Sequence, residues 1–414
     1  MNTYAEALSK EISEVNNCIN SIFIGGGTPT YLNIEALNII GESIKKLNII
    51  SNFEFTMEGN PGTFDKEKLK CIKAMGVNRL SIGLQAWQNR ILKKLGRIHT
   101  VEEFVEGYKL AREAGFKNIN VDIMFGLPGQ TMEDFKETLA NVIKINPEHI
   151  SCYSLIVEEE TPFYKMNYNG KLDLPDEDLE REMYEYAVHT LKENGYMQYE
   201  ISNFSKVCFE SKHNLVYWNL EDYIGCGVAA HSYHEGARYR NTSSLKKYIE
   251  KVLADESPVV EYKKNSTLDD IEEFMFMGLR KIEGISEIEF NNRFGIDINK
   301  VYEGILKKYR SLGLLNRENN RIFLTETGIQ LSNQVMSDFI ISSDKDWWEN
   351  HRKNKIFEGK VKCIQFNREL RIFFTIVKFD KKKVKWYFLI IAISTQWRWV
   401  LIKEVIIWIW MKGK

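Results

Sequence analysis

Polar residues follow one apolar run after another in the first 125 residues. The run 21–24 leads into a glycine triplet and a threonine, and glycines at the end of a strand let a ligand approach the backbone closely. Later runs are followed by two carboxylates, an amide and a guanidinium. We predict that these residues contact one small ligand, and they are Gly26, Gly27, Thr28, Glu58, Gln85, Arg97 and Asp122. This set suits a small zwitterion that carries a sugar, and capping of the following helices is the structural alternative for Glu58 and Asp122.

The elements that must position these residues alternate between strand and helix periodicity. Apolar spacing predicts strands at 21–24, 53–58, 79–85, 119–124 and 150–155, and helices at 4–15, 35–47, 65–75, 101–114 and 132–143. Such alternation is typical of parallel strands with outer helices, where function lies at the carboxyl ends of the strands. We therefore expect an α/β fold, a partial TIM-like barrel whose mouth collects the predicted contacts.

The segments GGGTPT, EGNP, RLSIGLQAW, LGRIHT and NVDIMFGLPGQT resemble the radical S-adenosylmethionine proteins related to oxygen-independent coproporphyrinogen III oxidase. The resemblance covers roughly residues 1–339 and implies a (β/α)6 barrel of the radical SAM type that lacks its first strand. It also implies S-adenosylmethionine as a cofactor. Its methionyl end would lie on Gly26, Gly27 and Thr28, its polar and ribose groups on Glu58, Gln85 and Asp122, its carboxylate on Arg97, and its adenine against Ile156.

Three later segments narrow the resemblance to the heme-chaperone branch of these proteins. They are HNLVYW at 213–218, AAHSY at 229–233 and EEFMFMGLRKIEGIS at 272–286. The first offers His213 as a ligand for heme iron and the flat faces of Tyr217 and Trp218 for the porphyrin. Further candidate ligands are His231, His234 and Cys226. The structural alternative is that this histidine and its aromatic neighbours simply pack a core.

The resemblance further implies a [4Fe–4S] cluster on a Cys-x-x-x-Cys-x-x-Cys loop upstream of the glycine triplet. Only Cys18 lies among the 24 residues before Gly25, and no two of the six cysteines are closer than 18 positions. We therefore interpret the sequence as lacking the first strand and the cluster loop. We expect no cluster and no radical SAM catalysis in this chain. The dispersed cysteines and the polar first residues predict a cytoplasmic protein.

The remaining chain divides by composition. We expect the barrel to occupy 1–205, a connecting region with HNLVYW to occupy 206–265, and a winged-helix-like domain to occupy 266–340. The helices of this last domain are predicted at 268–281, 286–294 and 298–312, with a hairpin at 314–325. The domain has 9 basic and 12 acidic residues, a balance that argues against nucleic acid as a partner.

Residues 341–414 differ from everything before them. They hold seven of the nine tryptophans, with 17 basic and 7 acidic residues. We interpret them as an extension foreign to the family, produced by a reading-frame change or a junction. Peripheral contact with an anionic membrane is the alternative.

These observations predict a heme chaperone-like protein that binds heme and passes it to an acceptor heme protein, such as a respiratory one. The alternatives are an oxygen-independent coproporphyrinogen III oxidase, which HNLVYW disfavours, and an inactive truncated remnant, which the missing cysteines favour.

Overall fold

The computed structural model describes residues 1–159, 161–341, 361–365 and 371–375. The chain divides into two compact units, Met1–Leu155 with Asp173–Ile341, and Ile156–Leu172 with Ser342–Lys414. None of the helices in the described part is long and apolar enough to span a bilayer.

The second unit contains the short helix α7 (Pro162–Tyr168) and an antiparallel pair of strands, β14 (Val361–Gln365) and β15 (Arg371–Thr375). The rest of the tryptophan-rich extension lies outside the described residues. Its interpretation as a foreign extension, and the alternative of membrane contact, therefore stay predictions.

A seven-stranded sheet in the order β1-β2-β3-β4-β5-β7-β6 forms the centre of the first unit. Strands β1 to β5 are parallel, and β7 and β6 complete the sheet as antiparallel strands. The strand bounds are β1 Ile19–Ile24, β2 Ile49–Gly59, β3 Arg79–Gln85, β4 Asn118–Phe125, β5 His149–Ser154, β6 Met197–Glu200 and β7 Asn203–Ser205. The partial α/β barrel predicted from the sequence is confirmed, whereas the antiparallel edge was not foreseen.

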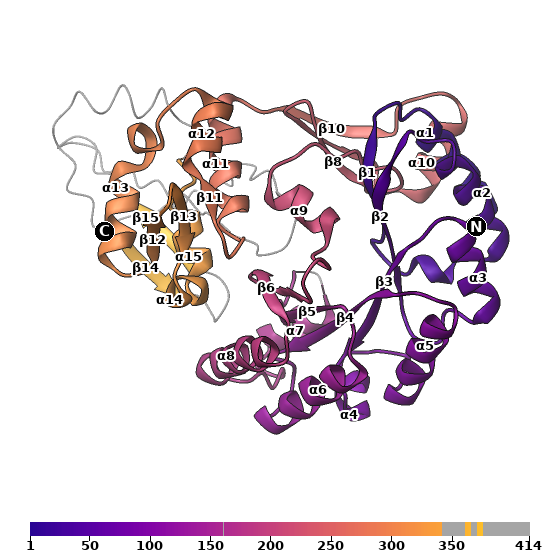
Figure 1. Cartoon of the computed structure of the whole chain (residues 1–414), viewed down its shortest axis with the longest axis horizontal. Helices are drawn as coiled ribbons and strands as arrows, with labels where there is room; N and C mark the ends of the chain where they lie inside the picture. Colours follow the sequence, from indigo (N-terminus) through magenta and orange to yellow (C-terminus); the bar gives the residue numbers. More distant parts are fainter. Residues whose placement is uncertain (160, 342–360, 366–370, 376–414) are drawn as a thin grey trace, which may run out of the picture. The chain divides into compact units, whose positions relative to one another are not determined.

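Helices cover the outer face of this sheet (Figure 1). They are α1 Asn2–Ser13, α2 Ile34–Ile44, α3 Lys66–Ala74, α4 Asn89–Lys94, α5 Val101–Glu113, α6 Met132–Ile145 and α8 Glu177–Glu193, with a 3-10 turn η1 at Pro29–Tyr31. Capping boxes begin two of them, at Thr100 with Glu103 and at Thr131 with Asp134. The sequence predicted five of the seven within a few residues, and the helical run at 179–192 lies within α8, while the short α4 was missed.

Side chains on the parallel strands alternate between an apolar outer face and a polar inner face. In β2, Phe55 and Met57 are fully buried in the core beneath the helices, so Glu54, Thr56 and Glu58 take the opposite face. Strands β3, β4 and β5 repeat this alternation. The concave side of the sheet is therefore lined by groups that need hydrogen-bond partners.

The connecting region covers part of this concave side with α9 (Lys212–Trp218), the helix that contains HNLVYW. It continues with a separate antiparallel sheet of order β10-β9-β8 and the helix α10. These elements are β8 His231–His234, β9 Ala237–Asn241, β10 Val259–Lys264 and α10 Leu245–Leu253.

The C-terminal domain has its own apolar core and a sheet of order β11-β13-β12. Its elements are α11 Thr267–Gly278, β11 Ile285–Ser286, α12 Glu287–Phe294, α13 Ile298–Ser311, β12 Leu315–Glu318, β13 Arg321–Leu324, α14 Glu326–Gln330 and α15 Ser332–Ser337. Asn319 and Asn320 form the hairpin turn with φ of 52° and 59°, the left-handed values that a tight two-residue turn requires. Three helices with a hairpin match the predicted winged-helix-like arrangement.

Glu11 fastens α1 to the connecting region. Its carboxylate accepts hydrogen bonds from the backbone N–H of Gly227 at 2.7 Å, from Asn241 Nδ2 at 2.7 Å, and from the hydroxyl of Tyr248. One acidic side chain thus satisfies three donors from three different segments.

We expect Glu11→Ala to lower the free energy of unfolding by about 2–4 kcal/mol, because it leaves buried donors without an acceptor. Urea denaturation of the full chain measures this. Glu14→Ala, at an exposed position near the end of the same helix, is the control and should change stability by less than about 0.5 kcal/mol. Similar losses for the two variants would contradict the anchoring role of Glu11.

Candidate functional site

The glycine triplet lies directly against Glu58. A Cβ atom at Gly25 would lie 2.8 Å from the carboxyl group of Glu58 and would also overlap the ring of Phe23, so glycine is required there. The backbone N–H of Gly26 donates to the Glu58 carboxylate, and Asn60 Nδ2 donates to the Thr28 hydroxyl at 2.8 Å. Cβ atoms at Gly26 or Gly27 would meet nothing within 4 Å, so this backbone faces open space.

Two carboxylates sit close to this loop with little compensation. Burial and, to a smaller extent, the charge of Asp122 raise the pKa of Glu58 to about 7, against a lowering by the Gly26 N–H. Burial also raises the pKa of Asp122, which accepts bonds from Asn120 Nδ2 at 2.8 Å and the Ser81 hydroxyl at 3.2 Å. Within the described residues neither carboxylate forms an ion pair. A cationic ligand would stabilise the charged form of both carboxylates.

Gln85 ends β3 in a strained conformation. Its φ is 69°, and the pairing register shifts between Gly83 and Gln85. The side chain is 2 % exposed, and its Oε1 has no hydrogen-bond partner among the described residues. A buried acceptor without a donor is costly, so a ligand donor at this point would stabilise it.

The pKa of Tyr153, on the inner face of β5, is affected by the charges of three of the predicted site residues. Its pKa is raised by burial and by the charges of Asp122 and Glu58, and is lowered by the charge of Arg97. These predicted residues therefore gather around one hydroxyl. Sequence reasoning missed Tyr153, although the alternation His149, Ser151, Tyr153 in the predicted strand could have marked it.

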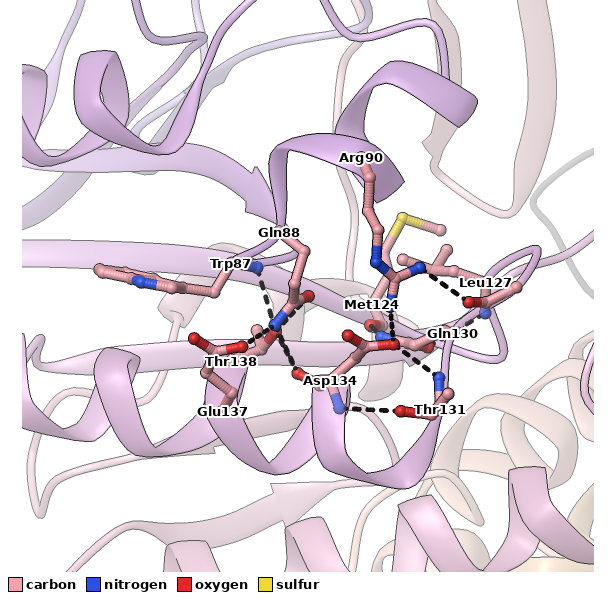
Figure 2. A network of polar contacts seen from close by, with 11 residues as sticks. Trp87, Gln88, Arg90, Met124, Leu127, Gln130, Thr131, Asp134, Glu137 and Thr138 are labelled. Atoms are coloured by element: carbon pink, nitrogen blue, oxygen red, sulfur yellow. Dashed lines mark hydrogen bonds and ion pairs between the residues drawn. The ribbon is translucent and has the colours of Figure 1, made fainter.

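Contacts between the loops hold this edge in place (Figure 2). Arg90 forms an ion pair with Asp134 of α6 and donates to the carbonyl oxygen of Gly129 at 3.0 Å. The Thr138 hydroxyl accepts from the backbone N–H of Trp87 at 3.0 Å. The loops that follow β3 and β4 are thus tied to the same helix, which fixes the backbone next to Gln85 and beyond Asp122.

The helix α9 begins on a buried carboxylate of β2. Glu54, 5 % exposed, accepts hydrogen bonds from the Ser211 hydroxyl at 3.1 Å and from the backbone N–H groups of Lys212 and His213 at 3.0 and 3.1 Å. The first N–H groups of a helix lack partners within the helix, and a negative charge there is favourable. Glu54 therefore places the HNLVYW segment on the inner face of the sheet.

His213 is enclosed in this arrangement. Its Nδ1 lies 3.0 Å from the Ser21 hydroxyl, its Nε2 lies 2.8 Å from the Tyr217 hydroxyl, and its ring stacks on Phe23 with centroids 5.1 Å apart. Burial lowers its pKa to about 4, so the imidazole is neutral at pH 7. Phe23 also borders Gly25, and the charge of Glu58 acts on Tyr217. The structure thus brings His213 and Tyr217 beside the glycine loop.

Trp218 faces a different neighbourhood. It is 6 % exposed, and the guanidinium of Arg280 lies 4.5 Å from its ring centroid. Arg280 in turn pairs with the fully buried Glu200 at 3.3 Å. This packing favours the structural alternative for Trp218.

The other candidate heme ligands have different surroundings from His213. His231 is exposed on β8, and His234 Nδ1 contacts Asp222 Oδ2 at 3.0 Å. Burial raises the pKa of the Cys226 thiol to about 12, and the charge of Glu11 adds to this rise. Ile156 belongs to the second compact unit, so its place in an adenine pocket stays a prediction.

The described residues do not fit an iron–sulfur cluster. No group of three His, Cys, Asp or Glu side chains among them could hold a metal ion, and Cys18 is exposed just before β1. The ligand edge, in contrast, fits S-adenosylmethionine in its chemistry, with an open glycine backbone, two buried carboxylates that form no ion pair among the described residues, and an amide oxygen without a hydrogen-bond donor there.

Comparison with known proteins agrees with this geometry. The Radical SAM superfamily matches residues 4–142, and the HemN C-terminal domain matches residues 265–331. The heme chaperone HemW of Bacillus subtilis is 40% identical over 324 residues, which cover 78% of this chain and 86% of that protein. The HemW of Lactococcus lactis is 37% identical over 343 residues, covering 82% and 90%. The chain belongs to the HemW family.

A solved structure gives the same fold. The coproporphyrinogen III oxidase HemN from Escherichia coli, a radical SAM enzyme, superimposes with a TM-score of 0.70 at 22% identity and covers 82% of each chain. At that identity the likeness shows the fold alone. It confirms the radical SAM architecture predicted from the sequence.

The raised pKa of Glu58 predicts a specific dependence of stability on pH. Its folded value of about 7 lies above the usual 4.5, so the folded state keeps a proton that the unfolded state loses between these values. The protonated Glu58 therefore contributes to the free energy of unfolding at low pH. This contribution, up to about 3 kcal/mol, is lost as pH rises toward and through 7.

We expect Glu58→Gln to be more stable than the wild type at pH 8 and nearly equal to it at pH 4. Chemical denaturation of both proteins at several pH values measures this. Glu106→Gln, at an exposed position on α5, is the control and should follow the wild-type profile. A constant difference between Glu58→Gln and the wild type across this range would contradict the raised pKa.

Proposed function

We propose that this protein is a heme chaperone: it binds heme at α9, binds S-adenosylmethionine at the adjoining strand ends, and transfers heme to an acceptor heme protein in the cytoplasm. The observation that carries this proposal is the continuity of the two sites. Phe23 touches both the glycine loop and the His213 ring. The similarity to the heme chaperone HemW of two bacteria supports the heme role. A respiratory heme protein is the acceptor we favour.

For S-adenosylmethionine we propose the same contacts that the sequence suggested. The backbone of Gly26 and Gly27, with Thr28, would bind its methionyl end. The ammonium and ribose hydroxyls would reach Glu58, Gln85 and Asp122, and Arg97 would pair with the carboxylate. When bound, the cofactor supplies positive charge to two desolvated carboxylates. The lack of fitting cluster ligands means that we derive no radical step for this chain.

For heme we propose His213 as the iron ligand and the Tyr217 ring as the face against the porphyrin. Both ring nitrogens of His213 are engaged, so iron ligation requires one of the contacts with Ser21 and Tyr217 to break. The neutral imidazole is already in the form that binds a metal. The buried Trp218 would hold α9 in place through Arg280.

Arg97→Ala should weaken S-adenosylmethionine binding by about 1.5–3 kcal/mol, roughly 10- to 150-fold, if the side chain pairs with the carboxylate. Isothermal titration calorimetry on the full chain measures this. Arg112 of α5 is unsuitable as a control, because it forms an ion pair with Glu148 at 2.8 Å and a hydrogen bond with Tyr108, so its loss would affect stability. Arg181→Ala, on the exterior of α8 at 3.7 Å from Asp178, should bind as the wild type does. Equal losses in both variants would reject the assignment.

His213→Ala should shift or abolish the Soret band of the heme complex, because the neutral imidazole is the proposed iron ligand. Titration of the full chain with heme, followed by absorbance, measures this. His189→Ala is the control, since His189 is exposed on α8, where its Nδ1 lies 3.3 Å from Glu193 Oε2. An unchanged spectrum and affinity for His213→Ala would remove the residue-level support for a chaperone.

A further inference from the structure

A continuous chain of buried and partly buried hydrogen bonds runs from Asp122 to the start of α9. Asn120 Nδ2 donates to Asp122 Oδ1 at 2.8 Å, and Asn120 Oδ1 lies 2.6 Å from His149 Nδ1. His149 Nε2 lies 2.8 Å from the Tyr199 hydroxyl, which also accepts from the backbone N–H of Ser211 at 3.3 Å. Ser211 is the N-cap of α9.

The donors and acceptors fix the direction of every bond in this chain. The Asn120 oxygen can only accept, so His149 Nδ1 carries the proton and donates it. His149 Nε2 is then an acceptor and receives the Tyr199 O–H. Burial lowers the pKa of His149 well below its usual value, with the charge of Arg79 acting in the same direction, so the ring stays neutral. Reversing any one bond would leave a buried group without a partner.

Because groups in this chain are buried, the loss of one of these hydrogen bonds would destabilise the structure. Asn120 is 2 % exposed, and His149 and Ser211 are fully buried. The Tyr199 hydroxyl also interacts with the side chain of Asn214, the second residue of HNLVYW. A single hydroxyl from β6 therefore contacts the N-cap of α9 and a residue of its motif, and joins both to the inner face of β4 and β5.

We propose that Tyr199 is a positioning residue that couples the ligand site at Asp122 to the orientation of α9. A ligand that forms a hydrogen bond with Asp122 alters the hydrogen bond that Asp122 accepts from Asn120. That change passes through His149 and Tyr199 to Ser211, whose hydroxyl is held by Glu54 at 3.1 Å. The role of α9 in heme binding rests on the proposed function, whereas the coupling itself does not.

A ligand-free double-mutant cycle tests the coupling, with hydrogen exchange of the α9 amides as the readout. Asp122→Ala removes the acceptor at one end, and Tyr199→Phe removes the hydroxyl near the other. We expect each alone to speed exchange at 212–218 by about threefold or more, the effect of one lost buried bond. In the Tyr199→Phe background, Asp122→Ala should add almost nothing, because the chain is already broken.

Tyr184→Phe is the matched control. Its hydroxyl is also buried and bonds the Ile201 carbonyl at 2.9 Å and Gln198 at 2.8 Å, outside the chain. In that background Asp122→Ala should keep its full effect on α9. Asp122→Leu, whose side chain is of similar size and has no acceptor, replaces Asp122→Ala if the latter fails to fold. Unchanged exchange at α9 on mutation of Asp122, or a full added effect beside Tyr199→Phe, would overturn the proposal.

A second measurement separates this proposal from the proposed function. S-adenosylmethionine should change the heme affinity of the wild type and of Tyr184→Phe by about threefold or more, and should not change that of Tyr199→Phe. A wild type that binds no heme while its exchange cycle shows coupling would refute the chaperone role and leave the coupling standing. If the wild type binds heme but the two substitutions have additive effects on exchange, the coupling would be refuted and the chaperone role would stand.

Discussion

The capping of α9 by the buried carboxylate of Glu54 is the interaction on which the arrangement of the site depends. The concave face of the sheet is polar, and an open partial barrel would leave that face exposed. Glu54 draws three donors from the start of α9 onto this face. Because the helix carries His213 and Tyr217, the same interaction places the heme-motif residues beside the glycine loop.

The strand β2 serves both sites through its two-residue periodicity. Glu54 and Glu58 are four residues apart and share the inner face, with Thr56 between them. Glu54 meets a helix N-terminus, which compensates its charge, whereas Glu58 meets the Gly26 N–H and the repulsive charge of Asp122. Burial, with a further contribution from the charge of Asp122, raises the pKa of Glu58 to about 7. One strand thus presents a satisfied carboxylate for structure and an unsatisfied one for a ligand.

Much of this architecture could be predicted from the sequence. Apolar periodicity identified five parallel strands and most of their helices, and polar residues after the strands identified Glu58, Gln85 and Asp122 as a common edge. Periodicity could not find α4, which has only six residues, or the antiparallel β6 and β7, which are four and three residues long. Such short segments contain too few residues to show a period.

The relation between the two sites could not be predicted, because it depends on contacts between residues about 190 positions apart, such as Ser21 and His213. The spacing of the motif allows His213 and Tyr217 to meet in an extended segment or in a helix, and in the helix that forms their rings do make contact. It gave no sign that Trp218 would turn toward Arg280. Likewise, His149 and Tyr199 have no local signature, since their role arises only when β5 and β6 meet α9.

The central claim is that α9 and the glycine loop form one continuous site. A crystal structure of the full chain with heme bound tests it most directly. The account predicts iron on His213, the porphyrin against Tyr217, and its edge beside Phe23 and Glu58. Heme seated away from the concave face, with His213 still between Ser21 and Tyr217, would contradict it.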